Sequence, residues 1–417
     1  MPKYDVKLLA PAGSWENLYT AIAAGCDEVY FGVKNLNMRI GGAKNFEVKD
    51  LKKISQICHQ SNVKCYLTLN TVIYDSELST MRKIINKVKE AEVDGIIAMD
   101  LAAITYASQI GVEVHISVQA GISNTESVKY YSQWADRVVL ARELTLSMQK
   151  KVIEQIKSQN IRGPKGELME VEVFAHGALC VAISGKCGMS LLANNKSANR
   201  GMCLQPCRRA YTVKDKETGQ EFVVDNQYVM SSQDLCTVGF LDKLLETGIK
   251  VLKIEGRARS PEYVNTVVKV YREAIDAVND GSYSLEKIQD WNQRLGTVFN
   301  RGLSDGYYLG KSFKDWAGIY GSRATKVKTL VGTVRHFFDK LSVVEVALQA
   351  DGLIVGDEYM ISGETHEAIF GILDDLRSEN GSKINQGKKG EIVTFVTPKA
   401  AKKGDKVYKF IPNENFL

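Results

Sequence analysis

The sequence predicts an α/β protein built on a (β/α)₈ TIM-like barrel, with a Cys-rich insertion before the last barrel strand and a small C-terminal β-barrel domain. Three observations support this. Short apolar runs alternate with helical segments, one stretch of over 70 residues breaks that rhythm, and short strand-like pieces separated by Gly, Asp and Lys begin near Lys326. We expect residues 1–280 to form the barrel, including an insertion at 178–245. Residues 281–325 form a connector and 326–417 the small domain.

The predicted barrel strands carry near-continuous apolar residues, as expected of strands buried on both faces. The eight segments are 7–12, 28–33, 64–70, 95–100, 113–119, 137–142, 170–177 and 251–257. Helix start signals lie between them, such as Ser14 and Asn124. A doubly wound open sheet is the alternative, but no GxGxxG motif follows an early strand, which disfavours it.

Barrel enzymes place their functional side chains at the C-terminal ends of the strands. The polar residues at the predicted ends are therefore candidate catalytic groups: Asn70, Gln119, Arg142, His176, Glu255 and Arg257. A guanidinium group matches the geometry of a carboxylate, so Arg39, Arg142 and Arg257 are also candidates to bind a small dicarboxylate metabolite.

Cysteines concentrate in the insertion with the spacing Cys180-x6-Cys187-x15-Cys203-x3-Cys207, and Cys236 follows after 28 further residues. Thiolates gathered in this way bind zinc or iron–sulfur clusters. Structural zinc sites usually use paired C-x2-4-C knuckles, and only one tight pair exists here, so the spacing favours iron–sulfur and leaves zinc as the alternative metal. Four thiolates suit several cluster types, of which we expect 4Fe-4S, and Cys236 stays open as a substitute ligand.

The other cysteines, Cys26, Cys58 and Cys65, stand alone on predicted helices or strands. Isolated cysteines in such places are usually buried packing residues. His59 is likewise expected to be an ordinary surface or packing residue.

Composition excludes several protein classes. Hydrophobic residues at 44% and charged residues at 25% are typical of globular proteins, and no apolar run resembles a secretory signal or membrane span. We therefore expect a cytoplasmic protein without a membrane partner, whose clustered cysteines bind metal rather than form disulfides. The net charge of +5 is compatible with an RNA partner, and we do not expect DNA.

Basic residues gather beside the cysteines and in the C-terminal domain, which makes that domain a possible RNA-binding module. Such groups can neutralise phosphates and position an RNA stem, although a solvated lysine face is the ordinary alternative. The candidate RNA contacts are Lys196, Arg200, Arg208, Arg209, Lys402 and Lys403.

Four segments carry a resemblance to a known family: EVFAHGALCVAISGKCGMS (172–190), ANRGMCLQPCRRAY (198–211), LLAPAGSWENLYTAIAAGCDEVYFG (8–32) and LKIEGRARSPEYV (252–264). They resemble the collagenase-like peptidase family U32 over essentially the whole chain. The resemblance implies an iron–sulfur cluster held by the cysteines of the family motif, here Cys180, Cys187, Cys203 and Cys207. It also implies hydroxylation of RNA or of a quinone precursor.

Within the family, a chain of this length looks most like the tRNA hydroxylation proteins. The resemblance then implies hydroxylation of C5 of the tRNA wobble uridine, with prephenate as a co-substrate or required metabolite. Three alternatives remain open. They are hydroxylation of a ribosomal-RNA cytidine by the same chemistry, a collagenase-like peptidase, and a non-catalytic zinc-stabilised RNA-binding protein.

Protease machinery is hard to find in the sequence. HExxH and GxSxG are both absent, and the one conceivable dyad, His176 with Cys180, would take a thiolate away from the metal. We therefore expect an iron–sulfur-dependent RNA-modifying enzyme.

Overall fold

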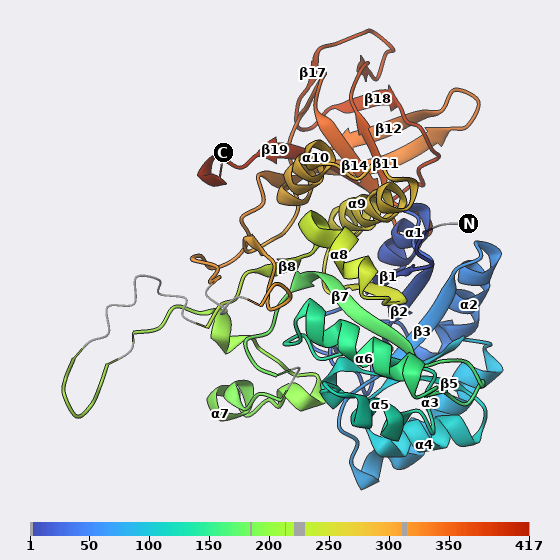
Figure 1. Cartoon of the computed structure of the whole chain (residues 1–417). Helices are drawn as coiled ribbons and strands as arrows, with labels where there is room; N and C mark the ends of the chain where they lie inside the picture. Colours follow the sequence, from blue (N-terminus) through green and yellow to red (C-terminus); the bar gives the residue numbers. More distant parts are fainter. Residues whose placement is uncertain (1–2, 184–185, 213, 221–229, 311–314, 417) are drawn as a thin grey trace.

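The computed structural model describes residues 3–183, 186–212, 214–220, 230–310 and 315–416 (Figure 1). Its centre is a closed barrel of eight parallel strands, because β9 pairs in parallel with both β1 and β7. Each strand falls within or close to one of the predicted segments, so the predicted (β/α)₈ TIM-like barrel is confirmed. The strands are β1 Lys7–Ala12, β2 Glu28–Phe31, β3 Lys64–Leu69, β4 Gly95–Ala98, β5 Glu113–Ile116, β6 Arg137–Val139, β7 Glu170–Ala178 and β9 Val251–Ile254.

Helices surround the barrel and bury one face each against it (Figure 1). In α2 the buried residues Leu51, Ile54, Ser55 and Cys58 recur at the three- and four-residue spacing of one helical face. Ser14 caps α1 as the sequence predicts, by accepting a hydrogen bond from the backbone of Asn17. The helices are α1 Trp15–Ala23, α2 Leu51–Gln60, α3 Leu78–Glu90, α4 Leu101–Gln109, α5 Thr125–Tyr131, α6 Leu146–Ser158, α8 Leu241–Glu246, α9 Pro261–Asp280 and α10 Leu285–Gly296.

Ion pairs fill the floor of the barrel, at the N-terminal ends of the strands. The Arg137 guanidinium lies 2.6 Å from a Glu28 oxygen and 2.7 Å from Glu170. The Lys253 ammonium lies 2.7 Å from Glu172, and Lys7 lies 2.8 Å from Glu170. Three cations thus face three carboxylates, and the charges of the floor balance.

The predicted insertion separates β7 from β9 and contains helix α7 (Met189–Asn194). Strand β8 (Asp234–Cys236) pairs antiparallel to the end of β7, and β10 (Leu303–Ser304) pairs with β8. The insertion contacts loops at the C-terminal ends of other strands, since the Val72 amide donates to the Asn199 carbonyl at 3.2 Å. The insertion therefore lies over the mouth of the barrel.

The C-terminal part forms a separate antiparallel half-barrel in the order β15-β14-β19-β11-β12-β18-β16, beside a small β13-β17 pair. It packs near α1 and α9 (Figure 1), where Lys328 pairs with Glu262 at 2.9 Å and the Ala368 amide donates to Thr20 at 3.0 Å. The strands are β11 Lys326–Phe338, β12 Val343–Leu348, β13 Leu353–Ile354, β14 Glu358–Ser362, β15 Ile369–Ile372, β16 Arg377–Ser378, β17 Gln386–Gly387, β18 Ile392–Val396 and β19 Lys406–Pro412. Among the described residues, no helix is both long and apolar enough to cross a membrane.

Candidate functional site at the barrel mouth

A cavity of about 60 Å³ opens at the C-terminal ends of the barrel strands. Residues two apart line it, because alternate side chains of a strand point into the barrel. This alternation selects Thr68 and Asn70 at the end of β3, Ser117 and Gln119 after β5, and Lys253, Glu255 and Arg257 along and after β9. Arg39, Arg142, Tyr30 and Phe174 complete its charged and aromatic lining.

Five of the six predicted catalytic residues line this cavity: Asn70, Gln119, Arg142, Glu255 and Arg257. The sixth, His176, does not. The polar lining residues that sequence reasoning missed are Thr68, Ser117 and Lys253, which the two-residue alternation from Asn70, Gln119 and Glu255 would have found.

His176 points away from the mouth because a β-bulge precedes it. Phe174 pairs with Lys253, but His176 pairs with Ile254, so two residues of β7 cover one step of β9. The bulge turns His176 outward, where its ring packs against Tyr271 and Tyr263 of α9. Burial, followed by Arg259, lowers its pKa to about 3, so the imidazole is neutral. The geometry supports a packing role for His176 rather than the expected catalytic role at the mouth.

Glu255 is the one carboxylate of the cavity lining, and it faces several guanidinium groups. Burial raises its pKa, but Arg39 and Arg142 outweigh burial and bring the pKa down to about 2. Arg39 also lies 2.7 Å from a Glu255 oxygen. Glu255 is therefore ionised near neutral pH, and it compensates only part of the positive charge around it.

Arg257 reaches the cavity through space that a glycine leaves open. A Cβ atom on Gly32 would lie 2.3 Å from the Arg257 guanidinium, so a larger residue there would displace it. The guanidinium donates to the Thr68 hydroxyl at 2.7 Å. Burial lowers the pKa of Arg257 to about 10, which still leaves it charged near neutral pH.

The Arg142 guanidinium has hydrogen-bond partners for only part of its donors. It donates to the Ala178 carbonyl at 2.8 Å and stacks on the Phe174 ring at 3.8 Å. Its buried Nε has no hydrogen-bond partner within the described part of the chain. A buried donor without a partner is costly, so Arg142 has capacity to bind an acceptor entering the cavity.

A hydrogen-bonded group of neutral side chains fixes the opposite wall. The Asn70 amide donates to Ser117 at 3.3 Å and to Gln119 at 3.2 Å, while its carbonyl accepts from the Met38 amide at 3.1 Å. These contacts orient the amides before any ligand arrives. The mouth thus combines fixed neutral donors and acceptors with an excess of cations.

The insertion brings its cysteines to this mouth. Gly201 (φ +78°) fits so closely against the loop after β2 that a Cβ would lie 2.2 Å from the Asn37 carbonyl. Met202, the residue before Cys203, also contacts this loop, because a Cβ on Gly41 would lie 3.4 Å from the Met202 sulfur. Cys180 follows β7 by two residues.

The four insertion thiols are exposed or half-buried. Cys187 and Cys203 both contact the start of α7, where the Met189 amide donates to the Cys187 sulfur at 3.4 Å and the Ser190 hydroxyl donates to the Cys203 sulfur at 4.0 Å. Burial is the largest effect that raises the pKa of the Cys207 thiol, and each of the other three cysteines raises it further. Four thiols gathered in one insertion are the soft sulfur donors that an iron–sulfur cluster or a zinc ion takes. The residues present therefore fit the expected iron–sulfur cluster, and zinc stays open as the alternative metal.

Cys236 lies apart from the exposed thiols. It is only 8% exposed within the barrel core, and the Tyr271 hydroxyl donates to its sulfur at 3.9 Å. Burial raises the pKa of this thiol to about 11. These surroundings favour packing over the predicted possibility of metal ligation.

The predicted RNA contacts divide into two groups. Lys196, Arg209, Lys402 and Lys403 are exposed. Arg208 is buried and donates to the carbonyls of Leu179 and Ser232, so in this structure it holds the insertion together rather than facing solvent. Arg200 pairs with Glu77 and donates to the Val72 carbonyl, so it holds the insertion on the barrel rather than facing solvent alone.

These features define a barrel protein whose cationic mouth lies beneath a thiol-rich insertion. The family model described as "Peptidase family U32" matches residues 13–318. The chain belongs to this family.

Relatives in the family carry different names. A protein named collagenase from Porphyromonas gingivalis W83 is 48% identical over 98% of this chain and 99% of its own length. A tRNA hydroxylation protein of Bacillus subtilis is 29% identical over 92% of this chain and 89% of its own. A 23S rRNA 5-hydroxycytidine synthase of Escherichia coli is 28% identical over 99% of this chain and 57% of its own. The family thus includes proteins named for RNA hydroxylation.

Proposed function

We propose that this protein is an iron–sulfur-dependent RNA hydroxylase that modifies C5 of the tRNA wobble uridine and uses prephenate, a small dicarboxylate, as a required metabolite. The observation that carries the proposal is the excess of guanidinium groups at the barrel mouth, directly beside the insertion thiols. Three arginines face one carboxylate there. Such a site attracts an anion, and it lies beside thiols that could bind a redox-active cluster.

The mouth suits a carboxylate ligand. Guanidinium groups bind carboxylates through paired, charge-assisted hydrogen bonds, and Arg142 has an unsatisfied buried Nε. The cavity of about 60 Å³ has room for the charged end of a ligand rather than for a whole nucleotide. The Asn70 and Gln119 amides would bind a hydroxyl or carbonyl of the same ligand.

Cys180, Cys187, Cys203 and Cys207 would hold the cluster. When bound, an iron–sulfur cluster supplies electron transfer or an open iron. The chain itself would position the cluster, because the Gly201 contact and the Arg200–Glu77 ion pair hold the insertion over the mouth.

RNA would approach from the exposed side of the insertion. Lys196 and Arg209 are exposed there and would neutralise phosphates, while Lys402 and Lys403 offer a second positive surface on the half-barrel. A target base must leave its stack to reach the mouth. The names of the relatives support either tRNA or ribosomal RNA as substrate, and ribosomal-RNA cytidine is the second candidate within this proposal.

A peptidase is the competing function, favoured by the relative named collagenase. All five histidines belong to the described residues, and none lines the mouth cavity. A Cys–His or Ser–His pair is therefore absent from the cavity lining, which disfavours proteolysis there.

The decisive experiment compares modified nucleosides by mass spectrometry in tRNA and ribosomal RNA from deletion cells and from cells complemented with wild type, Cys203→Ala or Arg142→Met. We expect loss of a hydroxylated wobble uridine in deletion cells, restored by wild type alone. Loss of a hydroxycytidine in ribosomal RNA would instead identify the second substrate.

A parallel assay of the purified wild-type protein on gelatin tests the peptidase. Unchanged nucleosides in both RNAs would overturn the proposed function. Gelatin cleavage that Arg142→Met abolishes would establish proteolysis at the same mouth. Zinc without iron, with RNA binding and no modification, would favour the non-catalytic zinc-stabilised alternative.

A further inference from the structure

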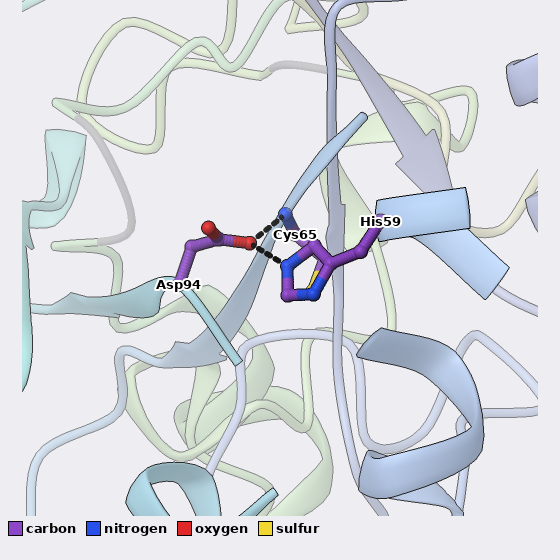
Figure 2. Close-up of side chains that lie close together, drawn as sticks. All are labelled: His59, Cys65 and Asp94. Carbon is purple, nitrogen blue, oxygen red and sulfur yellow. Dashed lines mark hydrogen bonds and ion pairs between the residues drawn. The ribbon is translucent and has the colours of Figure 1, made fainter. Parts of the chain in front are cut away.

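A second group of potential metal ligands lies at the opposite end of the barrel, at the N-terminal ends of β3 and β4. It consists of His59 near the end of α2, Cys65 in β3 and Asp94 just before β4 (Figure 2). One ligand atom from each lies within 4.8 Å of the other two. The group is separate from the insertion cysteines at the mouth.

The contacts within this group are already close to those of a coordination sphere. The His59 Nε2 atom lies 3.0 Å from the Asp94 Oδ2 atom, and the same oxygen accepts a hydrogen bond from the Cys65 amide at 2.8 Å (Figure 2). Tetrahedral zinc bound by S, N and O atoms sets its ligand atoms about 3.3–3.8 Å apart. The imidazole and carboxylate atoms are therefore already close enough to share an ion, and the Cys65 sulfur lies within 4.8 Å of both.

A further thiol extends the donor set. Cys58 of α2 is fully buried, and its side chain is the largest cause that raises the pKa of the Cys65 thiol, followed by burial. Cys58 therefore lies beside Cys65.

We propose that His59, Cys65 and Asp94 form a structural zinc site at the N-terminal end of the barrel wall, between α2, β3 and the segment before β4, with Cys58 as the fourth ligand. One imidazole, two thiolates and one carboxylate are all donors that zinc accepts. His59 is 44% exposed and Asp94 is 21% exposed, so an ion has a route from solvent to the buried sulfur atoms.

The position of the site indicates its role. It would join α2, β3 and the segment before β4, three parts of the wall that meet at the end of the barrel away from the cavity. The N-terminal face of such barrels serves stability rather than catalysis. Bound zinc would therefore raise the unfolding temperature and leave the chemistry at the mouth unchanged.

The test must separate this site from the insertion thiols. We would use the full-length chain with Cys180, Cys187, Cys203 and Cys207 all replaced by Ser, load it with zinc, desalt it and measure zinc by mass spectrometry. We expect about one zinc ion per chain and a higher unfolding temperature with zinc than without. Cobalt in place of zinc should give a thiolate-to-metal charge-transfer band.

Variants on that background identify the ligands. Asp94→Asn or His59→Ala should weaken zinc binding at least about tenfold. Cys65→Ser should weaken the cobalt band, and Cys65→Ser combined with Cys58→Ser should remove it. His366→Ala is the matched control, because His366 also pairs with a carboxylate, Asp405, at 2.7 Å. It should leave zinc binding unchanged.

Two results would overturn the site. One is a background protein that takes up no zinc at micromolar free zinc, which would leave His59 and Asp94 as an ordinary ion pair. The other is zinc content unaffected by Asp94→Asn and His59→Ala. If the background protein does not fold, the same substitutions in the wild-type chain decide the matter, by the difference in zinc per chain.

Discussion

The two ends of the barrel interior both contain buried arginine and glutamate side chains, but they differ in charge balance. On the floor, Arg137 lies between Glu28 and Glu170, and Lys253 pairs with Glu172. At the mouth, three arginines share Glu255, and Arg142 keeps a buried Nε without a partner in the described residues. The floor is charge-balanced, whereas the mouth has excess positive charge.

The difference teaches how one barrel separates stability from function. A buried ion network that satisfies its own charges holds strands together and has little capacity for a ligand. A cavity with unbalanced charge is less favourable for folding, but it gains free energy when an anion binds. Substitutions at the two ends should therefore affect different measurements.

The largest effect is expected on the floor. Arg137→Met leaves the buried Glu28 without its close cation, so we expect a loss of about 3–5 kcal/mol in the free energy of unfolding. Urea unfolding followed by circular dichroism measures it. Lys34→Met, which breaks an exposed ion pair with Glu47, should leave the midpoint of urea unfolding unchanged. Equal effects of the two substitutions would remove the distinction between floor and surface.

A comparable substitution at the mouth should weaken binding instead. Arg142→Met removes a charged donor, which corresponds to about 1.5–3 kcal/mol, or roughly a 10- to 150-fold weaker affinity for a small dicarboxylate. The unfolding midpoint should stay the same or rise, because Arg142 belongs to a group of like charges. Titration calorimetry with prephenate measures affinity. A large loss of stability with unchanged affinity would contradict the comparison.

A smaller effect is expected from Gly32→Ala. The new methyl group would displace the Arg257 guanidinium without removing its charge, so binding should weaken by less than in Arg142→Met. The calorimetric titration applies here too, with Gly42→Ala as the control, because a Cβ there meets open space. An affinity loss in Gly42→Ala equal to that in Gly32→Ala would show that general loop disturbance is responsible.

The smallest effect concerns pH. The pKa of Glu255 is lowered to about 2, so its attraction to the arginines is fully present above the ordinary carboxyl pKa of 4.5 and is lost as pH falls toward 2. Stability from this contact should be constant between about pH 5 and 8. Between pH 5 and pH 2, the unfolding temperature of Glu255→Gln should fall less steeply than that of the wild type. Identical slopes would indicate that Glu255 is not paired.

Much of the fold could be predicted from the sequence, because each barrel strand is a short apolar run and each run lies between helix signals. The positions of five mouth residues followed from the same rule, since the ends of parallel strands meet at one face. The C-terminal half-barrel could also be predicted, from its short strand-like segments and the turn residues between them.

Other features could not be predicted, because they depend on local geometry that the sequence pattern does not specify. The bulge before His176 reverses the direction of its side chain, and nothing in EVFAHG marks it. Arg208 was assigned to RNA because it is basic, whereas the insertion folds back and buries it against the Leu179 carbonyl. The floor network was also missed, because Glu28, Arg137 and Glu172 are far apart in the sequence.

The most direct test of the central claim, that the insertion thiols hold a redox centre over the cationic mouth, is the iron and sulfide content of the full chain purified without oxygen. We expect a brown protein with iron and acid-labile sulfide, both lost in Cys203→Ala and both retained in Cys236→Ala. A colourless protein, or one that keeps its iron without Cys203, would contradict the claim.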